Sequence, residues 1–271
     1  HNFIVKNVEE LANTIRRAFK IAKTGRPGPV LIDIPKDVTA AVTSYEAEKP
    51  EKIIRFSERI KEADIQNAIK MIKESKRPYI LVGGGAVISD AADELKEFVD
   101  KVDAPVCDTL MGKGAFNGTD ERYSGMLGMH GTKASNLGVS HCDLLIAIGT
   151  RFSDRVLGNP KTFAKNAKIL QIDIDPVEIN KNICVSASII GDVKAVLTVI
   201  NRRLEAQEHK EWMNTVKEYK EKYPLTYDKG CLTCPEIMEA IYDITKGEAV
   251  ITTEVGQHQM WAAQFYKYDK P

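Results

Sequence analysis

Two arginines in one short polar stretch are the residues best suited to bind an anion. Arg151 and Arg155 lie four residues apart in GTRFSDRV, with Asp154 between them. Guanidinium groups grip a carboxylate or a phosphate through paired hydrogen bonds. The same spacing also suits an ordinary ion pair on the surface. The stretch therefore predicts either an anion site or a solvated charge pair.

Two carboxylates end the next apolar run. Asp173 and Asp175 stand in IDIDP, where a carboxylate after a strand can bind ribose hydroxyls. Asp175 directly precedes Pro176, so it can equally cap a helix that starts there. His130 lies between glycines near an expected helix start, where a lone histidine is either structural or catalytic. These residues leave both a binding and a structural interpretation open.

A glycine triplet gives a third candidate loop. Gly83, Gly84 and Gly85 follow the apolar run PYILV and precede an expected helix. Without Cβ atoms they let a ligand approach the backbone, and a helix N-terminus favours phosphate. Their spacing is not that of the G-x-G-x-x-G dinucleotide motif. A tight turn packed for space explains them as well.

The closing stretch VITTEVGQHQMWAAQF resembles a further anion-binding unit. Its apolar run from Ala249 to Ile251 predicts a buried strand, and a helix is expected from about Gln257. The polar turn between them contains Gly256. Backbone N–H groups at such a helix start suit a diphosphate.

The predicted strands and helices that position these loops alternate along the chain. Continuous apolar runs alternate with amphipathic helices, which predicts a parallel sheet covered on both faces, a doubly wound α/β domain. Asn7 is expected to cap the first helix and Asp192 the last helix of this domain. Expected helices cover 7–23, 62–74, 90–102, 132–142, 176–182, 192–206, 206–228 and 234–245; expected strands cover 30–34, 78–82, 104–109, 143–149, 167–175 and 187–192.

Composition narrows the class of protein. The 271 residues are 43% hydrophobic and 28% charged, and 38 basic side chains balance 38 acidic ones. This balance argues against nucleic acid or an anionic membrane as partners. No apolar run approaches the length of a membrane-spanning helix, and no signal or transit pattern is present. The absent initiator methionine suggests a piece of a longer protein.

The five cysteines favour reduced thiols. The number is odd, and the pair Cys231 and Cys234 lacks the second pair or histidines that a zinc site needs. No metal site is expected. A reducing cytoplasm is the expected compartment.

Several blocks in order resemble one enzyme family. They are GRPGPVLIDIPKDV, VGGGAV, TLMGKGAF, GMLGMHGTKASN, IGTRFSDRVLGN, QIDIDPVEINKN, GDVK and TTEVGQHQMWAAQFY. The whole chain resembles the large catalytic subunits of acetolactate synthases (acetohydroxyacid synthases), of the biosynthetic type that contains FAD. The RFSDR block distinguishes this type from the flavin-free catabolic one.

The resemblance implies a domain layout and a fragment. Residues 1–42 match the end of a pyrimidine-binding domain, 43–59 a linker, 60–206 a Rossmann-like central FAD-binding domain, and 207–271 a linker helix and the start of a diphosphate-binding domain. The glutamate that activates thiamine and the magnesium-binding motif of the family have no counterpart here. We therefore expect this chain alone to be inactive, and its closing loop to hold thiamine diphosphate weakly.

The resemblance also assigns site residues. Arg155 and Lys36 match residues lining the channel for the 2-keto acid. Val255, Gly256, Gln257 and His258 match the loop that meets thiamine diphosphate. The residues that match FAD contacts are Arg26, Gly83, Gly84, Gly85, Thr109, Leu110, Met111, Leu127, Gly128, Met129, His130, Gly149, Arg151, Asp173, Ile174, Asp192 and Val193. Two departures are Ser153, where many relatives have aspartate, and Glu254, which we expect to point away from a diphosphate.

The implied reaction joins two 2-keto acids. Pyruvate loses carbon dioxide on thiamine diphosphate, which supplies the electron sink, and the two-carbon unit adds to pyruvate or 2-ketobutyrate. FAD is implied to be structural, and Mg²⁺ to be held outside this chain. The implied partners are further full-length subunits, as a dimer or tetramer, and a regulatory small subunit. The alternatives are an isolated FAD-binding module or a related 2-keto acid decarboxylase or oxidase.

Overall fold

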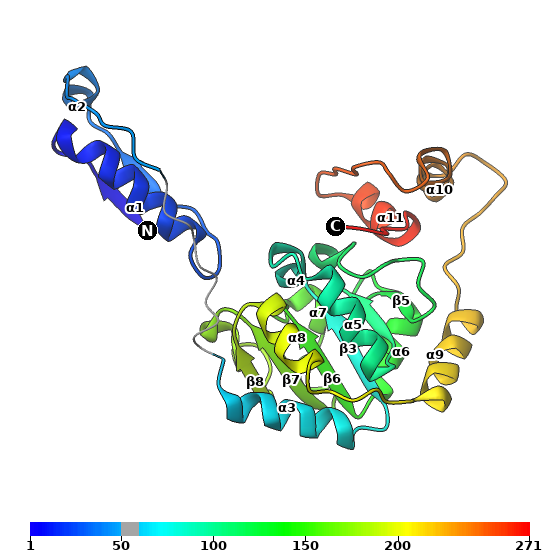
Figure 1. Cartoon of the computed structure of the whole chain (residues 1–271). Helices are drawn as coiled ribbons and strands as arrows, with labels where there is room; N and C mark the ends of the chain where they lie inside the picture. The colour runs from blue at the N-terminus through cyan, green and yellow to red at the C-terminus, as the bar shows by residue number, and fades with distance from the viewer. Residues whose placement is uncertain (50–59) are drawn as a thin grey trace. The chain divides into compact units, whose positions relative to one another are not determined.

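The computed structural model describes residues 1–49 and 60–271, and the chain divides into two compact units, His1–Phe56 and Ser57–Pro271 (Figure 1). The part of the expected linker at 50–59 lies outside the described residues. Residues 41–49 carry neither helix nor strand.

The first unit is a small α/β segment. Strands β1 (Asn2–Ile4) and β2 (Leu31–Asp33) pair in parallel, and a 3₁₀ turn η1 (Val8–Glu10) leads into helix α1 (Leu11–Lys23). Helix α2 (Lys36–Ala40) follows Pro35. Asn7 precedes η1 in extended conformation but makes no side-chain cap, so the cap expected of it is wrong. A backbone hydrogen bond closes the η1 turn instead, because Glu10 N–H donates to the Asn7 carbonyl.

The second unit is built on one parallel sheet of six strands. In space their order is β5, β4, β3, β6, β7, β8. Their bounds are β3 Pro78–Val82, β4 Val106–Asp108, β5 Tyr123–Met126, β6 Leu144–Ile148, β7 Lys168–Asp173 and β8 Ala187–Ile190. In chain order this is 3-2-1-4-5-6, the order of the Rossmann fold. The predicted doubly wound α/β fold is confirmed.

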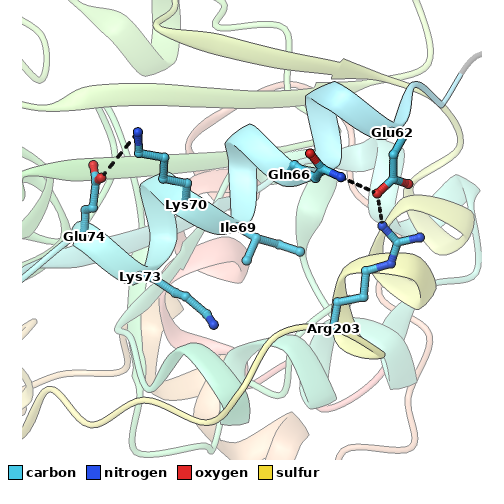
Figure 2. A pocket seen from close by; sticks show the side chains of 7 residues that line it. All are labelled: Glu62, Gln66, Ile69, Lys70, Lys73, Glu74 and Arg203. Carbon is cyan, nitrogen blue, oxygen red and sulfur yellow. Dashed lines mark hydrogen bonds and ion pairs between the residues drawn. The ribbon is translucent and has the colours of Figure 1, made fainter.

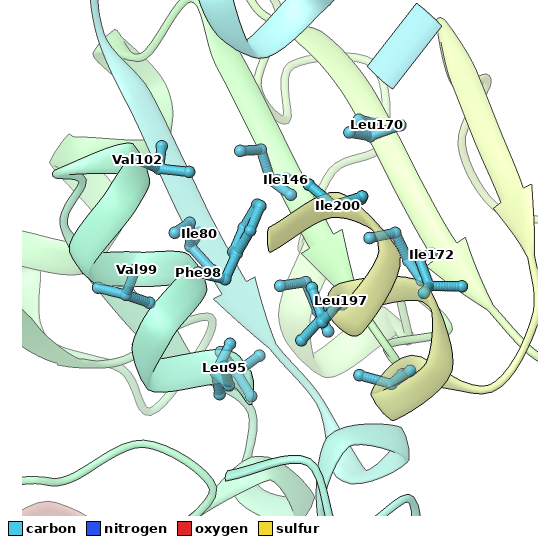
Figure 3. Close-up of a cluster of buried hydrophobic side chains, with 14 of the residues drawn as sticks. Ile80, Leu95, Phe98, Val99, Val102, Ile146, Leu170, Ile172, Leu197 and Ile200 are labelled. Atoms are coloured by element: carbon cyan, nitrogen blue, oxygen red, sulfur yellow. The ribbon is translucent and has the colours of Figure 1, made fainter. Parts of the chain in front are cut away.

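Both faces of the sheet are buried, which is why its strands are continuous apolar runs. On one face Ile80 and Ile146 pack against Phe98 and Leu197 from the covering helices, as Figure 3 shows. On the other face the neighbouring residues of the same strands pack against a second cluster that includes Trp212. The Trp212 indole N–H donates to the Pro78 carbonyl at 2.8 Å.

The helices of this unit mostly match the predicted ones. Helix α3 has the predicted bounds, and Asp192 caps α8 by accepting from Ala195 N–H. Several predicted bounds shift: α5 starts two residues late, α8 ends at Asn201, and α9 is shorter than predicted at both ends. Only a 3₁₀ turn follows Asp175. The helices are α3 Glu62–Glu74, α4 Gly84–Ile88, α5 Ala92–Val102, η2 Leu110–Gly112, α6 Lys133–His141, α7 Asp154–Leu157, η3 Pro176–Glu178, α8 Val193–Asn201, α9 Lys210–Lys222, α10 Cys234–Thr245 and α11 Gln257–Phe265.

The strand expected at Ala249 to Ile251 is absent. These residues belong to no helix or strand, and Val250 is 90% exposed. A parallel strand needs a neighbouring strand for its hydrogen bonds, and apolar content alone does not supply one. The helix expected from Gln257 is present.

Within the described part of the chain, none of the helices combines the length and apolar character needed to cross a membrane.

Candidate functional site

The candidate loops meet at the carboxyl edge of the six-stranded sheet. The strand order reverses between β3 and β6, so the loops after these two strands diverge to opposite sides. Ligands of open α/β sheets bind at this point. The segment after β3 is 83–85, where Gly83 leads into α4, and the loop after β6 is 149–152; both were singled out in the sequence.

The glycines at this point are required by the protein's own packing. A Cβ on Gly83 would lie 2.3 Å from the Gly149 carbonyl oxygen, and one on Gly85 would lie 2.6 Å from the Gly149 Cα. Gly83 and Gly85 N–H donate to the Ile148 and Gly149 carbonyls at 2.8 and 3.0 Å. These two N–H groups are therefore engaged by β6, and the structure supports a tight turn packed for space. A Cβ on Gly84 would instead lie 3.0 Å from the Met111 Cβ.

The loop after β6 is held by side-chain amides. Gly149 has φ of +60°, and Phe152 has φ of +51° with a buried ring. Gln171 Nε2 donates to the Thr150 carbonyl at 3.1 Å. Asn182 Nδ2 donates to the Arg151 and Phe152 carbonyls at 3.2 and 3.1 Å. Sequence reasoning missed both amides, although the polar Gln171 in the middle of an apolar strand was an available signal.

The loop after β5 meets the start of α7. Met129 N–H donates to the Arg155 carbonyl at 2.9 Å, and a Cβ on Gly128 would lie 2.3 Å from the same oxygen. Leu127 is buried, whereas Met129 and His130 are exposed. The structure thus brings together residues expected for FAD and the Arg155 expected for the substrate. The Arg155 guanidinium lies 3.9 Å from Asp154, with both side chains largely exposed, so the surface ion pair exists but stabilises the fold little.

The acidic candidates have structural roles. Asp175 Oδ1 accepts from Val177 N–H at 3.0 Å, which confirms the capping interpretation. Asp173 is buried and accepts from Asp175 N–H at 2.9 Å. Asp192 Oδ2 accepts from the Ser89 hydroxyl at 2.6 Å, and the same carboxylate caps α8. Their carboxylates are already engaged by the protein; Ile174 is half-buried and Val193 is buried.

A buried charged group includes Asp108, which directly precedes residues 109–111. Lys113 Nζ is 3.2 Å from Asp108 Oδ1, with side chains 11% and 4% exposed. Lys113 also donates to the Tyr123 hydroxyl at 2.6 Å, which donates to Asp108 Oδ2 at 2.9 Å. Burial raises the pKa of Asp108, opposed by the Lys113 ammonium. Burial likewise raises the pKa of Tyr123, and the Asp108 charge adds to it. Sequence reasoning missed this group.

The closing segment packs on the same unit. Gln264 Nε2 on α11 donates to the His130 carbonyl at 2.8 Å, and Gly118 N–H donates to the Tyr268 carbonyl at 2.8 Å. At the other end of α11, Val255 is 87% exposed, and Gln257 and His258 are exposed beside half-buried Gly256. Glu254 is exposed as well.

Two expected site residues lie in the first unit. Arg26 follows α1, and Lys36 is the first residue of α2; both are exposed.

Apolar side chains are exposed at the carboxyl edge. Leu110, Met111 and Met129 are 39%, 74% and 62% exposed and belong to the loops after β4 and β5. An apolar ligand group laid on these loops would remove them from water. This part of the edge fits a large, partly apolar cofactor better than a free anion.

A separate groove follows the outer side of α3. Ile69 lies between charged residues of α3 and Arg203, which pairs with Glu62 (Figure 2). Lys73 pairs nearby with Glu205 at 3.0 Å. The residues that line this groove come from α3 and from Arg203, and not from the loops that follow the strands. None of the expected site residues lines it. Its charges are paired with one another, so it is a poor anion site.

In the ranges 1–49 and 60–271, no cluster of three or more His, Cys, Asp or Glu residues could hold a metal ion. Cys107 and Cys142 are buried, and burial raises the pKa of the Cys142 thiol to about 12. Cys184 and Cys231 are exposed, and all five cysteines are free.

Comparison with known proteins identifies the family. Residues 65–200, which span the six-stranded sheet, match the family model described as thiamine pyrophosphate enzyme, central domain. The chain belongs to the thiamine pyrophosphate enzymes.

Curated relatives of this member of the family share one name. The acetolactate synthase large subunit of Haemophilus influenzae is 39% identical over 100% of this chain and 49% of its own length. Acetolactate synthase 3, chloroplastic, of Brassica napus is 41% identical over 100% of this chain and 43% of its own length. Acetolactate synthase, chloroplastic, of Arabidopsis thaliana is 42% identical over 100% of this chain and 42% of its own length. The chain spans less than half the length of these relatives.

Proposed function

We propose that the chain is part of the large subunit of an acetolactate synthase. The observation that carries this proposal is identity of 39–42% over the whole chain to curated proteins of that name. The parent protein would decarboxylate pyruvate and add the two-carbon unit to pyruvate or 2-ketobutyrate, in the biosynthesis of branched-chain amino acids. Bound thiamine diphosphate supplies the electron sink, and the protein supplies orientation and electrostatics.

We propose that the carboxyl edge of the six-stranded sheet binds FAD. The Rossmann strand order supports a dinucleotide at the point where the order reverses. The exposed Leu110, Met111 and Met129 support an apolar ring system on the adjacent loops. Exposed Arg151 is suited to a phosphate. Because the Gly83 and Gly85 N–H groups are engaged by β6, we assign the glycines to shape the loop and not to bind phosphate.

We propose that the 2-keto acid carboxylate pairs with Arg155, and, as a separate assignment from the family resemblance, that Lys36 contacts substrate in the parent protein. Both side chains are exposed, so neither is engaged in the core of its unit. The α11 N-terminus at Val255–His258 is proposed to meet the diphosphate of the cofactor, with Mg²⁺ held by residues outside this chain. These 271 residues alone are therefore expected to form no acetolactate.

The proposed partners and compartment follow from the same family. Full-length subunits are proposed to associate as dimers or tetramers and to bind a regulatory small subunit. We propose a cytoplasmic location; the plant relatives named above are chloroplastic.

Flavin retention tests the FAD site. The purified chain is loaded with FAD and passed over gel filtration, and flavin absorbance is measured against protein absorbance. Arg151→Ala is expected to lower the retained flavin several-fold with unchanged thermal unfolding, whereas Arg202→Ala, another exposed arginine, is expected to retain it. Equal retention by both variants would remove Arg151 from the site.

Product analysis tests the reaction. The parent protein is incubated with pyruvate, thiamine diphosphate and Mg²⁺, and acetolactate is the expected product. Acetaldehyde or acetate in its place would favour a decarboxylase or an oxidase. Acetolactate formed by the 271-residue chain itself would contradict the expected inactivity.

A further inference from the structure

Three successive carbonyl groups after β6 are held by side chains and not by secondary structure. The Thr150 carbonyl accepts from Gln171 Nε2, and the Arg151 and Phe152 carbonyls both accept from Asn182 Nδ2. Gln171 is fully buried in β7, while Asn182 comes from the segment after η3. Two amides from two different elements therefore fix one short turn.

The turn they hold is strained. Phe152 has φ of +51°, in the left-handed region that aromatic residues rarely adopt. Its ring is only 1% exposed and packs edge-on against Phe163 at 6.0 Å. Such a conformation persists only where the surroundings impose it, and it occurs preferentially at ligand sites. Ring burial fixes the side chain of Phe152, and the Asn182 amide fixes its carbonyl.

The strained turn lies at the point where the strand order reverses. Gly149, directly before it, approaches Gly85 from the loop after β3, and Arg151 is exposed within the turn. We propose that Gln171 and Asn182 are positioning residues that hold this turn so that Arg151 meets a phosphate group of the bound nucleotide. This inference rests on the FAD site proposed above.

The chemistry of the turn requires neutral donors. Carbonyl oxygens only accept hydrogen bonds, so an amide NH₂ can serve two of them at once, whereas a carboxylate would repel them. The Asn182→Asp substitution keeps the shape but removes the donor. Asn182→Gln keeps the donor on a longer side chain. The two substitutions separate hydrogen bonding from packing.

Trypsin cleavage of the 271-residue chain measures how firmly the turn is held. Cleavage of the Arg151–Phe152 bond requires the buried Phe152 to leave its site, so its rate follows the population of the open turn. Each hydrogen bond contributes a factor of about two to ten, so Asn182→Ala is expected to raise this rate roughly tenfold. Asn182→Asp is expected to do the same, and Asn182→Gln to restore part of the protection.

The control is Asn159→Ala. Asn159 is also exposed, and its side chain accepts its hydrogen bond from Lys161 N–H and not from residues 150–152. It is expected to leave cleavage after Arg151 within about twofold of the unsubstituted chain. Mass spectrometry of the fragments separates this cleavage from that after Arg155. Equal rates in Asn182→Ala and Asn159→Ala would overturn the role of the amide.

Fluorescence titration with FAD tests the consequence for binding. Asn182→Ala is expected to weaken FAD binding at least fivefold, with thermal unfolding like that of Asn159→Ala. Unchanged affinity in Asn182→Ala, with faster cleavage, would show that the amides hold the turn but do not position Arg151 for the ligand. If the unsubstituted chain binds no FAD, the proposed FAD site and the positioning role fail together, and the cleavage rates still decide whether the amide holds the turn.

Discussion

Replacing Lys113 by methionine tests the buried charged group beside the candidate site. The substitution keeps most of the side-chain volume and removes the cation that lies 3.2 Å from Asp108. Asp108 then keeps the hydrogen bond from the Tyr123 hydroxyl and loses its ion-pair partner. A buried carboxylate without a compensating charge is strongly unfavourable.

The magnitude follows from distance and burial. At an effective dielectric constant of about 20, unit charges 3.2 Å apart attract by about 5 kcal/mol. Removing one partner of a buried pair costs about 3–5 kcal/mol of folding free energy. The matched control is Lys96→Met, which breaks a surface pair with Asp100 at 3.3 Å whose side chains are 62% and 46% exposed. Its expected cost is below about 1 kcal/mol.

The folding free energy lost in Lys113→Met depends on pH in a defined direction. Burial raises the pKa of Asp108 in the folded chain above its unfolded value, so this group destabilises the fold above that pKa. The contribution of Asp108 to folding stability becomes less unfavourable as the pH falls from neutral through the pKa of the folded state. Without the Lys113 cation the pKa rises further, so Lys113→Met regains more stability on acidification than the unsubstituted chain. The difference between the two proteins is therefore largest near neutral pH and shrinks toward acidic pH.

Urea unfolding at neutral and acidic pH measures both effects. Tryptophan fluorescence is the signal, because buried Trp212 lies in the core beside the sheet. Asp108→Asn combined with Lys113→Met is expected to be more stable than Lys113→Met alone, since the uncompensated charge is gone. A loss in Lys113→Met no larger than in Lys96→Met, or a loss that grows on acidification, would refute the reasoning.

Two further substitutions test the turn after β6. Gly149→Ala and Gly158→Ala both place a side chain at φ of +60°, but only at Gly149 would the Cβ meet backbone, at 2.6 Å. Gly158→Ala is expected to cost about 1–3 kcal/mol, because its backbone conformation is strained for a residue with a Cβ, and Gly149→Ala clearly more, as thermal unfolding would show. Equal losses would contradict the close approach. Gln171→Leu leaves the Thr150 carbonyl without its donor and is expected to cost about 1–3 kcal/mol in urea unfolding. An unchanged free energy of unfolding would mean that water replaces the amide.

The sheet was predictable because its strands are apolar on both faces. The apolar runs at 78–82 and 143–149 alternate with predicted helices along the chain, which predicts buried strands. Both runs contain strands. Strand β5 was not predicted, because Tyr123–Met126 contains a serine and a glycine and is only partly buried. Its pairing with β4 comes from tertiary contacts that no local pattern records. Helix α4 was missed for a similar reason, since two glycines begin it.

The candidate site was predictable in its loops and not in its internal chemistry. Loops at the carboxyl ends of parallel strands must share one edge, which placed Gly83 and Arg151 together. The role of the glycines could not be settled from the sequence, because it depends on the distance between β3 and β6. The pairing of Lys113 with Asp108 and the reach of Asn182 to the 150–152 carbonyls also depend on where the chain returns in space.

The strand order also has a consequence for how the chain folds during synthesis. The first strand of the sheet to leave the ribosome, β3, occupies its centre, where Pro78 pairs with Leu144 of β6. Until β6 emerges, only one side of β3 can find its neighbour, β4, and the other side remains an open template. Such long-range parallel pairing slows folding and leaves edges exposed to aggregation. The nascent chain is thus most vulnerable after β4 and β5 have been made and before β6 closes the centre of the sheet.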